Sequence, residues 1–364
     1  MRNFAIKNAM NSTYKKQGKR GLFDKDFASE KLSGIGNPLE KLHKVIDFEM
    51  FRPELESNLL NYNKKSNAGA KPYDVVMMFK IILIKRFYNL SDQQTEYQII
   101  DRLSFKDFLG LSGGDKVPDE KSIWLFQDNL IKANLEEKLF EQFHNYLDTI
   151  GLFVNEGKII DASFVEVPRQ RNTPEENAKI KAGEGAELWN DNPHKKRQKD
   201  IDARWTQKGG TRFYGYKDHI KIDSKHKLID TYEVTSAEVH DSQLTEKLLC
   251  DKEKGQKIYG DSAYGGEPLA EVYERFGVEA VICERAYRNR PLTEEQKANN
   301  RVKSKTRSRV EHIFGFVTQS MHDFFSRSIG FNRIKGGIGL INLFYNMFRY
   351  EQIVRLKLQT VTAK

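Results

Sequence analysis

The sequence predicts an all-α region followed by a mixed α/β domain whose sheet has about five strands. Between about residues 38 and 152, apolar residues recur almost throughout at helical spacing. After Gly157, short apolar runs of strand length alternate with helical segments. Their order is strand, insertion, strand, strand, helix, strand, helix, strand, helix. This order is typical of a mixed sheet flanked by helices.

The first half of the chain predicts five or six helices behind a loosely ordered arm. Residues 1–35 are polar, with scattered glycine, serine and lysine, and predict the arm. Ser91 and Asp119 each precede an apolar periodic stretch and are expected to begin helices. The expected helical segments are 73–90, 91–100, 105–111, 119–130 and 135–150.

The second half predicts the sheet. The expected strands are 158–167, 211–223, 228–235, 257–263 and 278–283. Helices are expected at 241–249, at 268–276 and from Thr293 onward, apart from a glycine-rich joint at Gly336-Gly337. The charged stretch at about 169–208 predicts a basic insertion or long loop. The expected domains are an arm at 1–35, a helical domain at 36–152, the sheet domain at 153–355 and a tail at 356–364.

Charge and composition bound the partners. The net charge of +9 suggests a polyanionic partner, nucleic acid first and an anionic membrane surface second. The most apolar stretch, Val75 to Ile84, contains Lys80 and is too short and too charged to span a bilayer. Two cysteines are too few for a disulfide framework and fit a reducing cytosol. We therefore expect a soluble, cytoplasmic protein with no membrane partner.

Two aspartates occupy strand positions where a polar residue needs a reason. Asp161 follows Ile159-Ile160, and Asp261 follows Tyr259-Gly260. A carboxylate at a buried strand is costly unless it is paired, and a cation is a strong partner. Mg²⁺ takes oxygen ligands and uses one or two carboxylates plus phosphate oxygens. The pair predicts a metal site for phosphate chemistry; the alternative is that each aspartate caps a turn.

The third candidate acid is Glu311. Arg307 and Glu311 are four residues apart and share a face of a predicted helix. The apolar neighbours Val310, Ile313 and Phe314 favour a glutamate that faces a site, and the alternative is a surface salt bridge. Arg307 is expected to orient Glu311 or to hold a phosphate through its planar donor group.

Basic residues concentrate near these acids. Residues 285–309 hold nine Lys/Arg and two Asp/Glu, a net charge of 9 − 2 = +7. Such a run would keep a phosphate backbone close to the site, or it is a solvated helix face. Trp189 and Trp205 lie among the basic residues of 169–217. Aromatic rings in this setting either stack on an unpaired base or pack inside the protein.

These motifs together resemble the DDE transposases of bacterial insertion sequences, specifically the large family numbered five. The resemblance covers roughly residues 40–350, with eight motifs in the order of that family. The sheet domain contributes IIDASFVEVPRQRN at 159–172, RQKDIDARWTQK at 197–208, FYGYKDHIKID at 213–223, VTSAEVHDSQ at 234–243, IYGDSAYGG at 258–266 and RSRVEHIFG at 307–315. The helical region contributes LSDQQTEYQIIDRLSFKDFLGLS at 90–112 and VPDEKSIWLFQDNL at 117–130.

The resemblance implies an RNase H-like fold and a catalytic, metal-binding triad of Asp161, Asp261 and Glu311. It implies two Mg²⁺ ions, replaceable by Mn²⁺, with Asp161 bridging both, Asp261 on one and Glu311 on the other. The auxiliary or DNA-binding residues expected from the same motifs are Arg307, Arg309, His240, Lys217, Trp205 and Arg204. For the His240-Asp241 pair the alternative is a strand-to-helix turn in which Asp241 is the N-cap.

The expected function is transposition: binding of terminal inverted repeats, cleavage at the element ends and joining of the 3′-OH to target DNA. We expect a homodimer or higher oligomer on DNA, in a nucleoid-associated bacterial protein. Two rival functions are a nuclease of the same fold that does not join DNA and a domesticated, non-catalytic DNA-binding protein. Hydrolysis of small metabolites is a third, disfavoured by the basic runs. The sequence departs from relatives at Ser304, Thr318 and Phe126-Gln127, which bears on auxiliary DNA contacts and on whether this copy is fully active.

Overall fold

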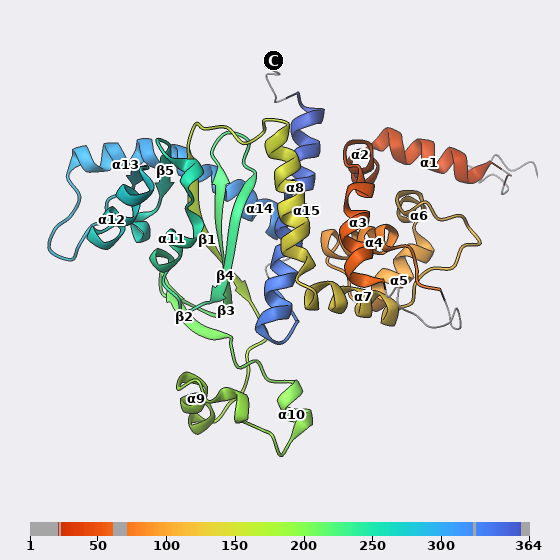
Figure 1. Ribbon diagram of the computed structural model, residues 1–364, viewed down its shortest axis with the longest axis horizontal. Helices are drawn as coiled ribbons and strands as arrows, with labels where there is room; N and C mark the ends of the chain where they lie inside the picture. Colours follow the sequence, from red (N-terminus) through yellow and green to blue (C-terminus); the bar gives the residue numbers. More distant parts are fainter. Residues whose placement is uncertain (1–20, 22, 61–70, 323–324, 358–364) are drawn as a thin grey trace, which may run out of the picture.

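The computed structural model describes residues 21, 23–60, 71–322 and 325–357. Figure 1 shows the helical region and the sheet side by side, with helices α8 and α15 between them. Most of the residues expected to form an arm, and most of the tail, lie outside the described part of the chain. Residues 24–35, at the end of that arm, form helix α1 (Asp24–Ile35), none of whose side chains is buried.

The helical region holds seven α-helices and one 3-10 helix between residues 38 and 149 among the described residues, more than the five or six expected. They are α2 (Pro38–Val45), η1 (Phe48–Phe51), α3 (Arg52–Leu59), α4 (Val75–Phe87), α5 (Asp92–Asp101), α6 (Leu103–Leu109), α7 (Glu120–Lys132) and α8 (Leu135–Thr149). Ser91 begins α5 with a reciprocal capping box, in which its hydroxyl accepts from the backbone of Gln94. Asp119 caps α7, so both expected helix starts are confirmed.

The sheet has six strands among the described residues, one more than expected. They are β1 (Lys158–Glu166), β2 (Arg204–Lys208), β3 (Thr211–Asp223), β4 (Ile229–Ser236), β5 (Lys257–Gly260) and β6 (Glu279–Ile282). The order is β2-β3-β1-β5-β6, and β4 also pairs with β3. Because β2 pairs with 211–215 and β4 with 216–222, both occupy one edge of β3. The first part of the sheet is antiparallel, and β1, β5 and β6 are parallel. This confirms the mixed, RNase H-like class.

The additional strand comes from the basic insertion. Instead of a long loop, residues 169–208 form α9 (Pro174–Lys181), η2 (Gly185–Glu187), α10 (Pro193–Arg197) and then β2. Trp189 is buried here, and its indole N–H donates to Glu176 at 2.6 Å. Figure 1 shows α9 and α10 projecting from the end of the sheet.

Helices cover both faces of the sheet. One face packs against η3 (Asp241–Leu244), α11 (Thr245–Leu248) and α12 (Glu267–Phe276), through residues such as Ile160, Leu248 and Tyr273. The single helix expected at 241–249 is therefore split into a 3-10 turn and a short α-helix. The other face packs against α14 (Glu311–Gln319) and α15 (Phe331–Arg355), which follow α13 (Glu294–Arg307) and η6 (Ser308–Val310).

The expected glycine-rich joint at Gly336-Gly337 is wrong. Both glycines lie inside α15, and the helical run from Thr293 is interrupted earlier, between Gln319 and Phe331. A Cβ on Gly336 would lie 2.7 Å from Cγ1 of Ile131, and a Cβ on Gly339 would collide with the hydroxyl of Tyr232. The glycines allow close approach of α15 to the helical region and to β4, so packing outweighs their low helix propensity.

One hydrophobic cluster joins the two parts of the chain. It runs from the helical region (for example Phe79 and Phe143) through α15 (Phe344) to the sheet face at Ile159 and Ile220. This shared core holds one face of β1 against the C-terminal helices. No helix of the described residues is both long and apolar enough to cross a membrane.

Candidate active site

The two aspartates meet where β1 and β5 run parallel. Lys158 pairs with Ile258 and Ile159 with Tyr259. Asp161 and Asp261 each follow the second of these pairs by two residues, so they occupy equivalent positions on the two neighbouring segments. β5 ends at Gly260, which leaves Asp261 at the carboxyl edge of the sheet. Open α/β sheets place their ligands at such an edge.

Asp161 is buried and its pKa is raised to about 6. Burial is the main cause, and the negative charge of Asp261 adds to it. Two contacts oppose the shift: the Ala162 N–H donates to Oδ1 at 2.8 Å, and Arg307 Nη1 donates to Oδ2 at 3.0 Å. A carboxylate held this way is poised to bind a cation.

Asp261 caps a turn, as the alternative hypothesis expected, and its carboxylate also acts on Asp161. Its Oδ1 accepts the Ala263 N–H at 2.8 Å and so caps the 3-10 helix η5 (Ser262–Tyr264). Its side chain is partly exposed, and its charge acts on both Asp161 and Tyr264. The cap fixes the carboxylate beside Asp161.

Glu311 is the first residue of α14 and is exposed, whereas its neighbours Val310 and Ile313 are buried. Within the described part of the chain, no three acidic, histidine or cysteine side chains gather closely enough to hold a metal ion. The structure therefore brings together Asp161, Asp261 and Arg307, and it does not add Glu311 to that group.

The expected auxiliary residues take different places. The guanidinium of Arg309 donates to the carbonyl of Ser224 at 2.7 Å, and Arg204 donates to carbonyl oxygens including that of Ile201 at 2.6 Å. The guanidinium groups of both residues therefore bind backbone carbonyl oxygens of the protein itself. Trp205 is exposed, with the Arg169 guanidinium 5.4 Å from its ring centroid.

The His240-Asp241 motif forms the turn before α11, but Asp241 is not its N-cap. His240 is the cap: its Nδ1 accepts the Ser242 N–H at 3.3 Å. Asp241 instead accepts from the buried Lys217 ammonium at 2.8 Å, and Lys217 also donates to the Val239 carbonyl. Lys217 is thus occupied inside the protein, whereas His240 is exposed.

Tyr264 was missed by the sequence reasoning, although it lies in the same motif as Asp261. It is fully buried and its hydroxyl has no hydrogen-bond partner among the described residues. Its pKa is raised by burial and then by the charges of Asp241, Asp161 and Asp261. The hydroxyl therefore lies within the field of all three carboxylates. An aromatic residue next to a strand-end acid was the available signal.

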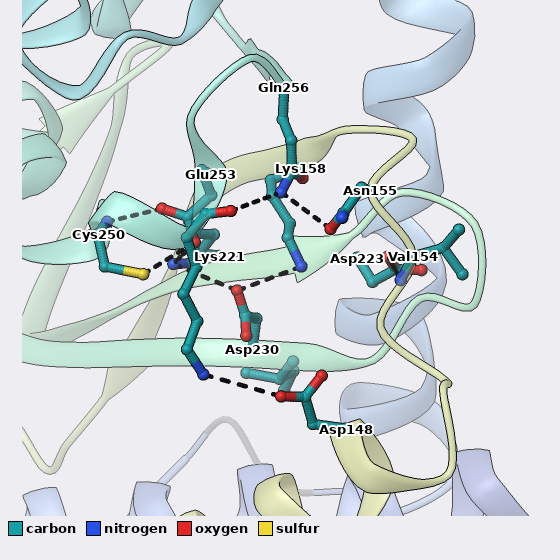
Figure 2. A network of polar contacts seen from close by, with 12 residues as sticks. Asp148, Val154, Asn155, Lys158, Lys221, Asp223, Asp230, Cys250, Glu253 and Gln256 are labelled. Carbon is teal, nitrogen blue, oxygen red and sulfur yellow. Dashed lines mark hydrogen bonds and ion pairs between the residues drawn. The ribbon is translucent and has the colours of Figure 1, made fainter.

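A separate charged cavity of about 300 Å³ lies between α8 and the sheet. Figure 2 shows its polar network, in which the Lys221 ammonium donates to Glu253 at 2.6 Å and lies 3.2 Å from Asp230. Lys158 lies 3.4 Å from the same Asp230 oxygen. Burial alone would raise the pKa of Asp230, but a hydrogen bond from His144 and the two lysine charges lower it well below its usual value.

This cavity is not the candidate active site. Lys221 pairs with Ile160, one residue before Asp161, so its side chain points to the opposite face of the sheet. Asp230 reaches that face because it is the extra residue of a β-bulge between β3 and β4. The positive and negative side chains of this cavity neutralise one another. We therefore interpret the network as a structural contact between the helical region and the sheet.

Comparison with known proteins agrees with the geometry at the sheet edge. Residues 153–347 match the family described as "Transposase DDE domain", and residues 27–129 match a "Transposase domain (DUF772)". The chain is also similar to the piggyBac transposase in a cryo-EM structure of its synaptic complex with hairpin DNA. That similarity has 14% identity and a TM-score of 0.43, and covers 92% of this chain and 78% of the other. Because the DDE family match spans more than half of the 364 residues and includes Asp161, Asp261 and Glu311, the chain belongs to the DDE transposases.

Proposed function

We propose that this transposase acts on an insertion sequence of the family numbered five. It binds the terminal inverted repeats, cleaves at the element ends and joins the freed 3′-OH to target DNA. The observation that carries the proposal is the Asp161–Asp261 pair at one edge of the sheet, with Arg307 donating to Asp161 at 3.0 Å.

The aspartate pair fits a divalent cation. Both groups offer carboxylate oxygens, and Mg²⁺ in phosphate chemistry commonly uses one or two carboxylates with the remaining ligands from water and substrate. Asp161 and Asp261 would hold the metal, and Glu311 is proposed as the third carboxylate because it lies four residues after Arg307 within the matched domain. When bound, two Mg²⁺ or Mn²⁺ ions would stabilise charge on the attacking and leaving oxygens.

The reaction needs no covalent enzyme intermediate. In the first step water attacks the phosphorus at the element end, the P–O3′ bond breaks, and the products are a 3′-OH and a 5′-phosphate. In the second step that 3′-OH attacks a phosphodiester of target DNA and displaces the 3′-oxygen of the target strand. The chain contributes positioning and charge: Arg307 orients Asp161, and the basic run of 285–309 holds the phosphate backbone.

The helical region is proposed to recognise the inverted repeats, and two protomers to bring two ends together. α15 connects the helical region to the sheet, because it packs against α2, α7 and α8 as well as β4. This connection would hold a DNA end that is bound by the helical region in a fixed position relative to the aspartate pair.

A strand-transfer assay separates the proposal from its nearest rival. A duplex with a pre-cut 3′-OH element end is mixed with supercoiled plasmid, Mg²⁺ and protein. Joined product that disappears with a 3′-deoxy end supports a transposase. Metal-dependent nicking with no joined product would favour a nuclease, and binding without nicking would favour a non-catalytic DNA-binding protein.

A further inference from the structure

A cationic cleft of about 240 Å³ lies between the basic insertion and the segment that leads into α15. Arg169 and Lys199 of the insertion line one side, and Arg327 lines the other. The two sides are joined next to the cleft, where the Ser326 N–H donates to the Glu166 carbonyl at 2.9 Å. Figure 1 shows the insertion projecting from this end of the sheet. Two segments far apart in the sequence therefore build one surface.

The cleft lies on the face of the sheet that carries Asp161. Asp161 pairs with Ile220, which belongs to the cluster that α15 covers. Val167 lines the cleft and directly follows β1, where its N–H donates to the Tyr214 carbonyl at 3.1 Å. Val167 is six residues after Asp161, so both side chains lie on one face, and Val167 packs with Ile334 of α15. At about 3.3 Å per residue, the cleft begins about 20 Å from Asp161.

Lys199 brings a poorly compensated charge to the cleft. Its ammonium donates to two neutral oxygens, the Arg171 carbonyl at 2.7 Å and the Asn172 amide oxygen at 2.6 Å. Burial lowers the pKa of Lys199, against an opposing effect of the Glu176 charge. An anion in the cleft would offset the lost hydration of this ammonium.

The two arginines are available to a ligand. Arg169 and Arg327 are both exposed, and the Arg169 guanidinium lies 5.4 Å from the ring centroid of Trp205. Stacking on that ring keeps the planar donor group in one orientation without using its N–H groups. Gln170 also lines the cleft, and its buried Oε1 has no hydrogen-bond partner among the described residues. The polar lining is therefore incomplete without a ligand.

The carboxylate among the lining residues, Asp200, is already satisfied. Its Oδ1 accepts from the Tyr216 hydroxyl at 2.7 Å and from the N–H groups of Asp202 and Ala203, both at 3.0 Å. Its Oδ2 accepts from the Gly330 N–H at 3.3 Å, so Asp200 ties the insertion to the start of α15. The described lining residues hold three cations and one acid, a net charge of 3 − 1 = +2. This balance favours an anionic ligand.

We propose that this cleft binds the phosphodiester backbone of the DNA on which Asp161 acts, through Arg169, Lys199 and Arg327. The inference rests on the proposed function for its substrate. Arginine donates to two phosphate oxygens at once, and lysine adds a point charge. Phosphates of one strand advance about 3.4 Å along the helix axis, so a separation of about 20 Å corresponds to about six nucleotides. The contact fixes the position of the DNA on the enzyme without reading its sequence.

The salt dependence of DNA binding tests this contact. The full chain is titrated in EDTA with a labelled duplex that carries the element end, at about 50 to 200 mM NaCl. Arg169→Gln and Arg327→Gln are each expected to lower the slope of log Kd against log salt by about 0.9, the value for one phosphate. Lysine at the same positions is expected to restore the slope. Arg275→Gln, an exposed site on α12 over the other face of the sheet, is the matched control.

A second measurement locates the contact on the DNA. A single methylphosphonate, which removes one backbone charge, is moved along each strand of the same duplex. Wild type is expected to lose affinity when the neutral group stands about six nucleotides from the cleaved bond. Arg327→Gln is expected to lose no further affinity with that duplex, because the contact is already absent.

The outcomes separate this inference from the function beneath it. Slopes and affinities that are unchanged in both glutamine variants overturn the DNA contact, even if urea unfolds those variants earlier, which would mark a structural role. Variants that bind inorganic phosphate more weakly but DNA normally would also overturn it, and would assign the cleft to a small anion. If wild type cuts DNA through Asp161 and the slopes do not change, the cleft fails and the transposase stands. If the slopes change as expected and wild type never cuts any DNA end, the proposed catalytic function fails instead.

Discussion

Replacing the buried Asp218 by asparagine is expected to stabilise the protein above neutral pH. Asp218 lies on β3 under α15, and its Oδ1 accepts from the Asn342 amide at 3.2 Å. Burial raises its pKa from 3.8 to about 7, against a lowering effect of that hydrogen bond. The gap between 3.8 and 7, at 1.36 kcal/mol for each pH unit, corresponds to about 4 kcal/mol at most for ionising the folded protein.

The pH window follows from the direction of the shift. The folded pKa lies above the unfolded one, so the stability linked to the proton is complete below pH 4 and is lost between about pH 4 and 7. Asp218→Asn carries no such proton. We expect equal stability of variant and wild type near pH 4 and a gain of about 2 to 4 kcal/mol for the variant at pH 8.

Urea unfolding at pH 4, 6 and 8 measures this difference. Asp230→Asn is the matched control on the neighbouring strand, because its cationic partners lower the pKa of Asp230. That variant is expected to lose stability at pH 8. A stability difference for Asp218→Asn that is the same at all three pH values would refute the reasoning.

Two local predictions concern packing and capping. Gly339→Ala is expected to lower the free energy of unfolding by about 1 to 3 kcal/mol, because the new Cβ collides with the Tyr232 hydroxyl. Gly34→Ala in α1 is the control and should not lower it, because nothing lies near its Cβ. The midpoints of urea unfolding compare the two variants. Ser91→Ala is expected to cost about 1 kcal/mol by removing the capping box with Gln94, and Ser91→Thr should retain most of it; a full loss in the threonine variant would contradict the capping argument.

The strands that the sequence predicted well are those whose signals lie within their own short stretch of chain. The 211–223 strand has the predicted bounds because alternation and the turn after Asp223 are both local signals. For the same reason, Asp161 could be placed on a strand and Asp261 at the end of one. Their meeting at one edge depends on the parallel pairing of β1 with β5, which follows from the element order.

The errors concern residues whose role depends on distant partners. Gly336 and Gly337 suggested a joint, but the tight contact of α15 with Ile131 explains them, and that contact joins segments about two hundred residues apart. Asp241 suggested an N-cap, yet its carboxylate accepts a hydrogen bond from Lys217 on β3. Periodicity gives no information on either partner.

Glu311 is the least determined part of the candidate site. Its apolar neighbours Val310 and Ile313 are buried as the pattern suggested, but the carboxylate itself is exposed. The 3-10 turn η6 separates α13, which ends at Arg307, from α14, which begins at Glu311. The four-residue spacing between Arg307 and Glu311 therefore does not fix the direction of the Glu311 side chain.

The most direct test of the central claim is metal-dependent cleavage of a duplex that carries the element end. Wild type, Asp161→Ala, Asp261→Ala and Glu311→Ala are compared in Mg²⁺, Mn²⁺ and EDTA, with Glu274→Ala, an exposed acid on α12, as control. We expect wild type and the control to nick DNA with either metal, and the three other variants to bind DNA without cutting it. Cleavage that persists in any of these three variants, or that persists in EDTA, would contradict the account.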